Sequence, residues 1–399
     1  MSELVSVVLV GIGGYGGTYC SLLLNQGSNP VAKIVGVVDP FAEKASFYAQ
    51  LKEKNIPFYN TLTEFYQQHK AELAVISTPI SLHCPQTCEA LEHGSNVLCE
   101  KPLCALISEA EQMLAARDRA GLQVAIGYQW SFSSAMRALK ADILSGRLGQ
   151  PKRLKTIALW PRKDSYYARN NWAGALQNAR GEWVLDSPAN NACAHYLHNM
   201  FFLLGATPET SVGLKSVQAE LYRANAISNY DTCIFRVATA SGAEVLFYST
   251  HACGRLLGPV FEFEFTKATV NYARYASGTL AEVTAKFQDG SQKLYGFPDA
   301  DGVSAKLWDT IRAVRGQGTI SCGIETAMMQ TICINAAMQS CPEIKEFPPE
   351  LVYKMGVPGA QVKVMTGLAE YMEQAYHSNQ MLAEVCSEPW VQPGKVVSC

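Results

Sequence analysis

The opening stretch of the chain constrains its fold more than any other part. An apolar run over residues 5–10 leads directly into the spacing Gly-x-Gly-x-x-Gly, formed by Gly11, Gly13 and Gly16, and then into a leucine-rich, helix-like segment. In such a strand–turn–helix, Gly11 permits the tight turn, Gly13 lets the backbone approach a pyrophosphate, and Gly16 lets the helix pack closely on the strand. The helix N-terminus presents N–H groups and a partial positive charge to phosphates. The pattern therefore predicts a dinucleotide-binding turn.

An acidic residue ends the next predicted strand, over residues 33–38. Asp39 stands where a carboxylate accepts hydrogen bonds from the ribose hydroxyls of NAD and repels the additional phosphate of NADP. NAD is therefore the predicted cofactor, and NADP is less favoured. The alternative is a glycine-rich turn followed by a surface aspartate.

Length and composition exclude several classes of protein. A chain of 399 residues suggests two domains, and 48% hydrophobic with 17% charged residues indicates a globular protein. A net charge of −2 without a basic block disfavours nucleic-acid binding. No apolar run is long enough to span a membrane, and the first apolar run lacks the features of a signal peptide, so a cytoplasmic location is expected.

The thirteen cysteines are scattered and mostly lie in apolar segments, as expected of small buried hydrophobes. His83, Cys84 and Cys88 fall at helical spacing, but no second cluster accompanies them. We therefore predict no metal site.

The periodicity predicts two domains, 1–127 and 128–399, with an extension from about residue 342. In the first, helical patterns alternate with five strands and predict an α/β fold with a doubly wound parallel sheet; the strands are expected at 5–10, 33–38, 73–77, 96–99 and 123–126, and the helices at 41–54, 62–70, 83–92 and 107–120, the last stopping at Gly121. The second is predicted to be α+β, with a largely antiparallel open sheet. Its expected strands are 153–159, 217–222, 231–238, 243–250, 260–265 and 281–288, and its expected helices are 136–144, 194–204, 305–314, 324–338 and about 364–376.

Two further motifs resemble a known family. The third strand ends in Ser77-Thr78-Pro79 with His83 opening the next helix, and the fourth strand runs into Glu100-Lys101-Pro102. Together with the glycine-rich turn, these resemble the Gfo/Idh/MocA oxidoreductases, most strongly over residues 5–130 and no longer after about residue 342. The resemblance implies an N-terminal Rossmann domain that binds NAD, and an α+β domain whose open sheet often forms a dimer or tetramer contact. A homodimer or homotetramer is therefore expected.

Lys101 is the first catalytic candidate. Near a nicotinamide, a lysine can hydrogen-bond a substrate oxygen, help to move its proton and stabilise a developing alkoxide. Pro102 disfavours helix at Lys101 and so holds it at the strand end, although a solvated loop lysine is the alternative. The resemblance implies that Glu100 contacts the nicotinamide ribose or holds Lys101. The predicted cofactor-binding residues are Gly11, Gly13, Gly14, Tyr15, Gly16, Asp39, Thr78, Pro79, His83, Glu100, Lys101 and Gln129.

A second constellation lies between residues 186 and 198. Family dehydrogenases usually show an Asp, a His four residues later and often an Asp three residues after that. A gapless register on Leu203-Leu204-Gly205 places Asn191, His195 and His198 at these positions, where the spacing predicts one face of a helix start. His195 can act as acid or base, or can be a buried structural histidine. Asn191 cannot titrate, so a proton relay would run through Lys101 and His195; an alternative register with an insertion places Asp186 in the first Asp role.

The aromatic loop over residues 160–172 interleaves Trp and Tyr with Arg, Lys and Asn. Flat rings suit the C–H faces of a sugar, and arginines suit hydroxyls or carboxylates, although interface loops share this composition. The predicted substrate-binding residues are Asn191, His198, Arg162, Tyr167, Trp172 and, by family analogy, Tyr128.

The sequence therefore predicts an NAD-dependent oxidoreductase that moves hydride between nicotinamide and a ring carbon of a sugar, sugar acid or cyclic polyol. One alternative is an NAD-assisted glycoside hydrolase that works by transient oxidation and elimination. Another is a non-catalytic sensor that retains the dinucleotide fold, because fold alone does not decide function.

Overall fold

The computed structural model describes residues 4–274 and 278–399, and the chain divides into two compact units. Unit 1 comprises Met1–Ser133 with Asp301–Met328, and unit 2 comprises Ser134–Ala300 with Met329–Cys399. The predicted boundary lay between residues 127 and 128; residues 301–328, assigned there to the second domain, pack within unit 1. Residues 1–3 of the first predicted domain and 275–277 of the second lie outside the described residues.

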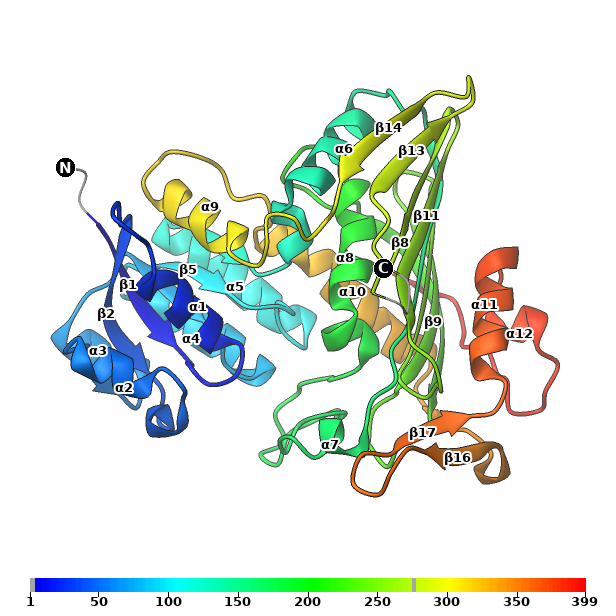
Figure 1. Cartoon of the computed structure of the whole chain (residues 1–399), viewed down its shortest axis with the longest axis horizontal. Helices are drawn as coiled ribbons and strands as arrows, with labels where there is room; N and C mark the ends of the chain where they lie inside the picture. The colour runs from blue at the N-terminus through cyan, green and yellow to red at the C-terminus, as the bar shows by residue number, and fades with distance from the viewer. Residues whose placement is uncertain (1–3, 275–277) are drawn as a thin grey trace. The chain divides into compact units, whose positions relative to one another are not determined.

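Unit 1 is built on a six-stranded, all-parallel sheet with the order β3-β2-β1-β4-β5-β6 (Figure 1). Its strands are β1 (Val5–Val10), β2 (Ala32–Val38), β3 (Phe58–Tyr59), β4 (Leu73–Ile76), β5 (Asn96–Cys99) and β6 (Val124–Ile126). Every residue of β4 is buried, because helices cover both faces of such a sheet. The strand order reverses between β1 and β4, so the loops leaving these two strands open a crevice at the carboxyl edge. The predicted doubly wound parallel sheet is confirmed.

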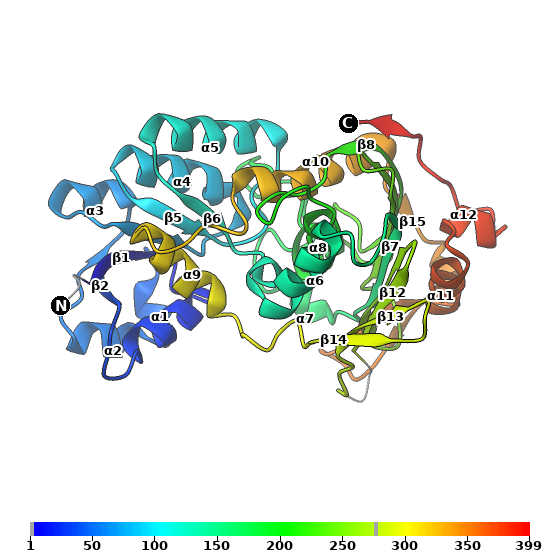
Figure 2. The ribbon, with the colours of Figure 1, turned by 90° about the horizontal axis from the view of Figure 1, so that it is seen from above.

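Helices cover both faces of this sheet. Figure 2 shows α1 and α2 on one face and α4 and α5 on the other. The helices of unit 1 are α1 (Gly16–Leu24), α2 (Tyr48–Glu53), α3 (Leu62–Gln68), α4 (His83–Glu92), α5 (Ile107–Ala120) and α9 (Ala305–Val314), with short 3₁₀ turns at Ala42–Lys44, Ile80–Leu82 and Gln129–Phe132. Gly121 ends α5 in the left-handed conformation, as predicted. The predicted helix over 41–54 is shorter, because the backbone at Ala45 is extended.

Unit 2 is built on a ten-stranded sheet with the order β14-β13-β12-β11-β7-β10-β9-β8-β15, and β18 also pairs with β8. Its strands are β7 (Pro151–Leu159), β8 (Leu214–Arg223), β9 (Thr232–Thr239), β10 (Glu244–Thr250), β11 (Leu257–Phe265), β12 (Ala268–Ala273), β13 (Val283–Phe287), β14 (Gln292–Gly296), β15 (Lys345–Glu346) and β18 (Val397–Ser398). Only the β7–β10 and β8–β15 pairs are parallel among the pairs described, so the largely antiparallel sheet is confirmed.

One face of the unit 2 sheet packs on α6 (Ser134–Leu144) and α8 (Ala194–Leu203) (Figure 2). Phenylalanines supply much of this core, with Phe201 and Phe202 on α8 and Phe235 and Phe247 on the sheet. The short helix α7 (Asp164–Tyr167) interrupts the aromatic loop, and α10 (Ile324–Ser340) begins in unit 1 and ends in unit 2.

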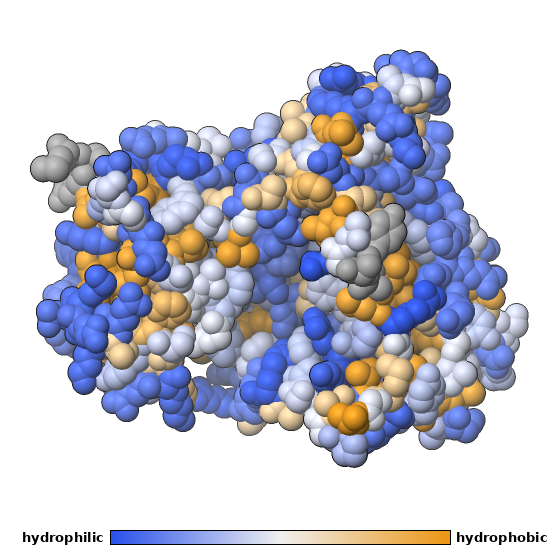
Figure 3. Space-filling model, viewed as in Figure 1, coloured by the Kyte–Doolittle hydropathy of each residue, from blue (hydrophilic) through white to orange (hydrophobic). Residues whose placement is uncertain are grey.

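The C-terminal extension covers part of the opposite face of this sheet (Figures 1 and 2). It forms a hairpin of β16 (Val352–Met355) and β17 (Val362–Met365), followed by α11 (Leu368–Ser378) and α12 (Leu382–Val385). Leu368, Met372 and Leu382 join one buried apolar cluster with Tyr222 and Tyr248 of the sheet. The single helix predicted near 364–376 was wrong at its start, because residues 364 and 365 belong to β17 and Gly367 turns the chain with a φ of 76°. The β16–β17 hairpin also exposes Tyr353 and Val357, and Figure 3 shows apolar surface at the lower edge of the molecule, where this hairpin lies.

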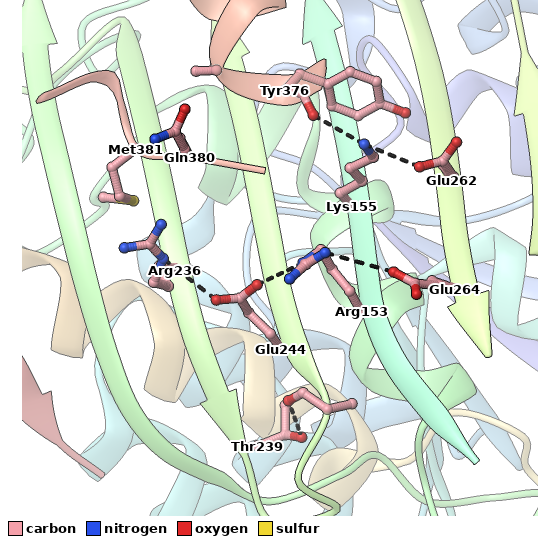
Figure 4. Close-up of polar contacts among 12 residues, drawn as sticks. Arg153, Lys155, Arg236, Thr239, Glu244, Glu262, Glu264, Tyr376, Gln380 and Met381 are labelled. Carbon is pink, nitrogen blue, oxygen red and sulfur yellow. Dashed lines mark hydrogen bonds and ion pairs between the residues drawn. The ribbon is translucent and has the colours of Figure 1, made fainter. Parts of the chain in front are cut away.

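Charged side chains also lie on this outer face, on β7, β9, β10 and β11 (Figure 4). Arg153 on β7 pairs with Glu244 on β10 at 2.7 Å and with Glu264 on β11 at 3.6 Å. Lys155, one pleat further along β7, pairs with Glu262 at 3.0 Å and donates a hydrogen bond to the Tyr376 carbonyl of α11. The outer face therefore combines an apolar cluster under the extension with salt bridges between neighbouring strands.

A buried carboxyl group of the sheet accepts hydrogen bonds from the extension. Glu220 of β8 is fully buried, and its two carboxylate oxygens accept hydrogen bonds from the backbone N–H groups of Leu382 (2.9 Å) and Ala383 (3.0 Å). Burial raises the pKa of Glu220 to about 7, against the opposing effect of these hydrogen bonds. Since the folded protein holds this proton more tightly than the unfolded chain does, the contribution of Glu220 to stability is complete below pH ~4.5 and is lost as pH rises through 7.

We expect Glu220→Gln to flatten the pH dependence of unfolding between pH 5 and 8, by about 3 kcal/mol at most. Urea unfolding of both proteins at four pH values in this range measures the slope. Glu343→Gln is the matched control, because Glu343 is an exposed carboxyl group that should leave the slope unchanged. Equal slopes for wild type and Glu220→Gln would contradict the assignment.

No helix in the described part of the chain is both long and apolar enough to cross a bilayer.

Candidate functional site

The glycine-rich turn lies at the carboxyl end of β1, on the crevice where the strand order reverses. Gly11 has a φ of 79°, and a Cβ added there would lie 3.0 Å from atoms of Ser77 and Thr78. A Cβ added at Gly16 would collide with the carbonyl oxygen of Gly11, so helix α1 can approach the turn only with glycine at this position. Gly13 is exposed and an added Cβ there meets no atom within 4 Å, which leaves open space over the backbone for a pyrophosphate. The turn therefore fits the dinucleotide that the sequence predicts.

Asp39 directly follows β2, the next strand along the carboxyl edge. Its carboxylate accepts the backbone N–H of Ile12 in the glycine-rich turn (2.9 Å) and that of Phe41 (2.8 Å). The side chain is half-buried. Asp39 is thus fixed beside the turn, in the place that a ribose-binding carboxylate occupies.

The Thr78–Pro79 turn follows β4 on the other side of the reversal. His83, the first residue of α4, is buried and places Nδ1 2.8 Å from the Pro102 carbonyl and Nε2 3.0 Å from the Thr78 carbonyl. Burial lowers the pKa of His83, so the ring is neutral at physiological pH and donates through one nitrogen only. The ring lies between the Thr78 turn and the segment after β5 and can donate to only one of the two carbonyls at a time. A direct contact between His83 and a cofactor stays a prediction.

Glu100 and Lys101 follow β5, which pairs with β4. The Glu100 carboxylate is buried, receives the Tyr19 hydroxyl at 2.6 Å and forms an ion pair with Lys306 of α9. Its Oε2 also accepts the backbone N–H of Lys101 at 3.2 Å. Lys101 itself is half-buried.

Gln129 and Tyr128 follow β6, where Gln129 is half-buried and Tyr128 is fully buried. Unit 1 thus brings to one sheet edge the predicted cofactor residues that follow β1, β2, β4, β5 and β6. Their contacts with a cofactor stay predictions.

In unit 2, Asn191 and Asp186, the two alternative candidates for the first Asp role, lie next to each other. The Asn191 side-chain amide donates a hydrogen bond to Asp186 at 2.7 Å, and Asp186 also accepts the Gly174 N–H at 2.6 Å. Asn191 lies in a π-helical turn, Pro188–Ala192, and α8 begins only at Ala194. The predicted single helical face through 191, 195 and 198 was therefore wrong at its first residue, because Cys193 interrupts the helix.

The two histidines of α8 differ in their surroundings. His195 is half-buried near the start of the helix, whereas His198 is fully buried and stacks on Phe202. Burial, assisted by Lys140, lowers the pKa of His198 to about 3 and keeps the ring neutral. His198 thus lies in the core of unit 2, and its contact with a substrate stays untested.

The aromatic loop forms a stack of alternating rings and guanidinium groups. Arg162 lies 4.7 Å from the Tyr166 ring and Arg169 lies 3.7 Å from it, while Arg169 also lies 5.4 Å from the Trp172 ring and 3.8 Å from Asp186. Tyr166 is the centre of this stack, and Tyr167 packs edge-on against it at 5.2 Å. The predicted contact of Tyr167 with a substrate stays a prediction.

Sequence reasoning did not select Tyr166, Arg169 or His251 for the site. His251, just after β10, lies 5.7 Å from the Tyr166 ring, and its Nδ1 contacts the Trp160 carbonyl at 2.8 Å. Burial, together with Arg162, lowers the pKa of His251 to about 3, so the ring is neutral and donates through Nδ1. The local sequence around His251 gives no sign of a functional site. His251 reaches the aromatic loop only because of the strand pairing in the sheet.

All thirteen cysteines are free thiols, and most are buried. Among the described residues, no group of three or more His, Cys, Asp or Glu side chains is arranged to hold a metal ion.

Comparison with known proteins agrees with this geometry. Residues 5–128 match the family described as "Oxidoreductase family, NAD-binding Rossmann fold". Two curated relatives are the 2,7-anhydro-N-acetylneuraminate hydratase of Mediterraneibacter gnavus, 26% identical over 51% of this chain and 50% of the relative, and the inositol 2-dehydrogenase of Rubrobacter xylanophilus, 28% identical over 38% and 42%. The match thus spans half or less of each of these relatives.

The fold also has solved counterparts. The WlbA dehydrogenase of Bordetella pertussis, solved with NADH and UDP-GlcNAcA, matches with a TM-score of 0.70 and 22% identity over 86% of this chain and 97% of that one. This likeness shows the fold of both units. Residues 5–128, the NAD-binding Rossmann domain, are thus similar to the Gfo/Idh/MocA family of oxidoreductases.

Proposed function

We propose that this protein is an NAD-dependent oxidoreductase that transfers hydride between the nicotinamide and a ring carbon of a sugar, sugar acid or cyclic polyol. The observation that carries the proposal is the arrangement of one sheet edge. The glycine-rich turn, Asp39, the Thr78 turn and Glu100-Lys101 follow β1, β2, β4 and β5, around the point where the strand order reverses. This is where doubly wound sheets bind dinucleotides.

The residues have distinct proposed tasks. Asp39 binds the adenosine ribose hydroxyls, Gly13 and Gly14 approach the pyrophosphate, and Glu100 accepts a hydrogen bond from the nicotinamide ribose. NAD, when bound, supplies the hydride acceptor. Lys101 hydrogen-bonds the reacting hydroxyl and accepts its proton, and His195 passes that proton on.

The names of the relatives support a carbohydrate-like substrate, since they include an inositol dehydrogenase and a protein solved with a sugar nucleotide. The ring-and-guanidinium stack of Arg162, Tyr166, Arg169 and Trp172 suits such a molecule, because rings cover C–H faces and arginines bind hydroxyls or carboxylates. We also propose a cytoplasmic homodimer or homotetramer.

One comparison favours a second candidate. The relative from Mediterraneibacter gnavus is named a hydratase, which implies no net oxidation or reduction by that protein. A redox-neutral reaction on a glycoside, through transient oxidation and elimination, is therefore the second proposal.

Absorbance of NADH at its near-UV band separates these proposals. Purified protein is incubated with excess NAD and a panel of sugars, sugar acids, cyclic polyols and simple glycosides. Accumulation of NADH with one compound supports the dehydrogenase. Consumption of a glycoside without NADH supports the redox-neutral reaction, and neither outcome with any compound would contradict both.

Replacing Asp39 by serine should shift cofactor preference from NAD toward NADP. The change removes both the acceptor for the ribose hydroxyls and the negative charge that repels a 2′-phosphate, so the ratio of the two dissociation constants should move by about tenfold or more. Titration of NADH and NADPH by fluorescence measures this ratio. Glu43→Ser, a carboxylate on the neighbouring turn, serves as the control. An unchanged ratio would show that Asp39 only braces the turn through Ile12 and Phe41.

A further inference from the structure

A buried lysine from late in the chain lies at the carboxyl edge of the unit 1 sheet, where the predicted cofactor residues gather. We call this edge the cofactor edge. Lys306, on α9, is 1% exposed and forms an ion pair with the Glu100 carboxylate. Its Nζ also donates to the Gly127 carbonyl at 3.4 Å. None of the motifs in residues 5–130 includes it.

The same ammonium group contacts the glycine-rich turn. Lys306 Nζ lies 4.6 Å from the centre of the Tyr15 ring and 5.6 Å from that of Tyr19. Tyr15 belongs to the Gly-x-Gly-x-x-Gly turn and is 41% exposed, while Tyr19 is buried and donates its hydroxyl to Glu100. Lys306 thus joins the turn after β1 to the segment after β5.

The pair is charged in spite of its burial. Burial alone would raise the pKa of Glu100, but Lys306 and the Tyr19 hydroxyl hold that pKa below its usual value. Burial would likewise lower the pKa of Lys306, and Glu100 raises it instead. The titratable groups that face Glu100 are Lys306 on α9, Tyr15 and Tyr19 at the start of α1, His83 on α4, and Cys99 and Lys101 on either side in sequence.

The carboxylate also has no room to move away. A Cβ added at Gly127 would lie 2.9 Å from Glu100 Oε2, so the backbone of the β6 loop closes that side. Oε2 accepts the Lys101 N–H, and Oε1 is shared between Tyr19 and Lys306. The position of the Lys101 backbone therefore depends on where the Glu100 carboxylate is held.

We propose that Lys306 is a positioning residue for the cofactor site: it keeps Glu100 ionised and fixed between Tyr15 of the glycine-rich turn and Lys101. Glu100 can then accept the hydrogen bond from the nicotinamide ribose, and Lys101 keeps its place at the strand end. This inference rests on the proposed function, because it takes NAD as the ligand of this edge.

Lys306→Met tests the proposal without any substrate. Met removes the ammonium and keeps the buried volume, so Glu100 takes up a proton at neutral pH and loses its role as an acceptor. We compare the Kd of NADH for Lys306→Met with that for wild type at each pH. The ratio of the two should be about tenfold or more larger at pH 5.5, where Glu100 is protonated, than at pH 9. The double variant Lys306→Met with Glu100→Gln should show a constant ratio, because no carboxyl group is left to titrate.

Lys155→Met is the matched control, since Lys155 is also a buried lysine paired with a glutamate, in unit 2. It should change stability and leave the pH profile of NADH binding as in wild type. A constant Kd ratio in Lys306→Met would overturn the inference. Failure of wild type to bind NADH would instead contradict the proposed function.

A stability measurement decides the case in which Lys306→Met folds but is too unstable for NADH titration. Removing Lys306 alone leaves the buried Glu100 either as an unpaired charge or as a group that must take up a proton, and both cost stability, whereas the double variant has no carboxyl group there. The double variant should therefore unfold at a higher urea concentration than Lys306→Met. A double variant that is no more stable than the single one would overturn the inference.

Discussion

Turnover should fall by roughly 10²–10⁴-fold when Lys101 is replaced by alanine, while the affinity for NADH changes little. The proposed proton transfer between Lys101 and the substrate hydroxyl is made only in the reacting complex, so its loss appears in kcat more than in binding. Steady-state kinetics on the first active compound from the panel, together with NADH titration, measures both quantities.

Two further variants sharpen this result. Lys101→Arg keeps a positive charge but cannot accept a proton and donate it again near neutral pH, so it should remain strongly impaired. Lys70→Ala removes an exposed lysine of unit 1 and should behave as wild type. A kcat for Lys101→Ala within a few-fold of wild type would refute the catalytic role.

The substitution Gly16→Ala should abolish measurable NADH binding and lower the thermal stability of the protein. The new Cβ collides with the Gly11 carbonyl oxygen, so either α1 moves away from β1 or the turn changes its conformation. Overpacking of this kind destabilises by about 1–3 kcal/mol, and the displaced N–H groups no longer surround the pyrophosphate.

Gly13→Ala separates binding from folding in the same turn. A Cβ at Gly13 meets no protein atom within 4 Å, so the melting temperature should stay at the wild-type value while a methyl group blocks the approach of the pyrophosphate. Gly318→Ala, at another open position, should change neither property. For Gly16→Ala, full NADH affinity would contradict the role of the turn. A melting temperature of Gly16→Ala equal to that of wild type would contradict it as well.

The doubly wound sheet could be predicted because its signals are local. The apolar run that became β1, the glycine spacing after it and the stop at Gly121 each depend on neighbouring residues only. For the same reason the predicted cofactor residues could be chosen from positions that directly follow strands.

Several candidate site residues depend on contacts that no local pattern encodes. Asn191 and Asp186 were competing assignments in the sequence, and the fold places them in one hydrogen bond. Tyr166 and Tyr167 are adjacent, and only the turn of α7 decides that Tyr166 lies between two arginines. In the sequence, nothing distinguishes Lys306 from an ordinary helix lysine. Only the packing of α9 within unit 1 brings it beside Glu100.

The C-terminal extension was beyond sequence reasoning for a related cause. Leu368, Met372 and Leu382 indicate a buried face, but their spacing does not say which surface they bury. From the sequence, the open sheet is expected to contact another subunit. In the structure, the C-terminal extension of the same chain covers part of its outer face.

The return of residues 301–328 to unit 1 bears on how the protein is made. At a synthesis rate of about 5–20 residues per second, roughly 9–35 s separate the emergence of residue 133 from that of residue 306. During that interval the nascent Rossmann domain holds Glu100 without its ammonium partner and β5 without α9 beside it. Final closure of the cofactor edge is therefore a late step on the ribosome, and it follows synthesis of nearly the whole sheet of the second unit.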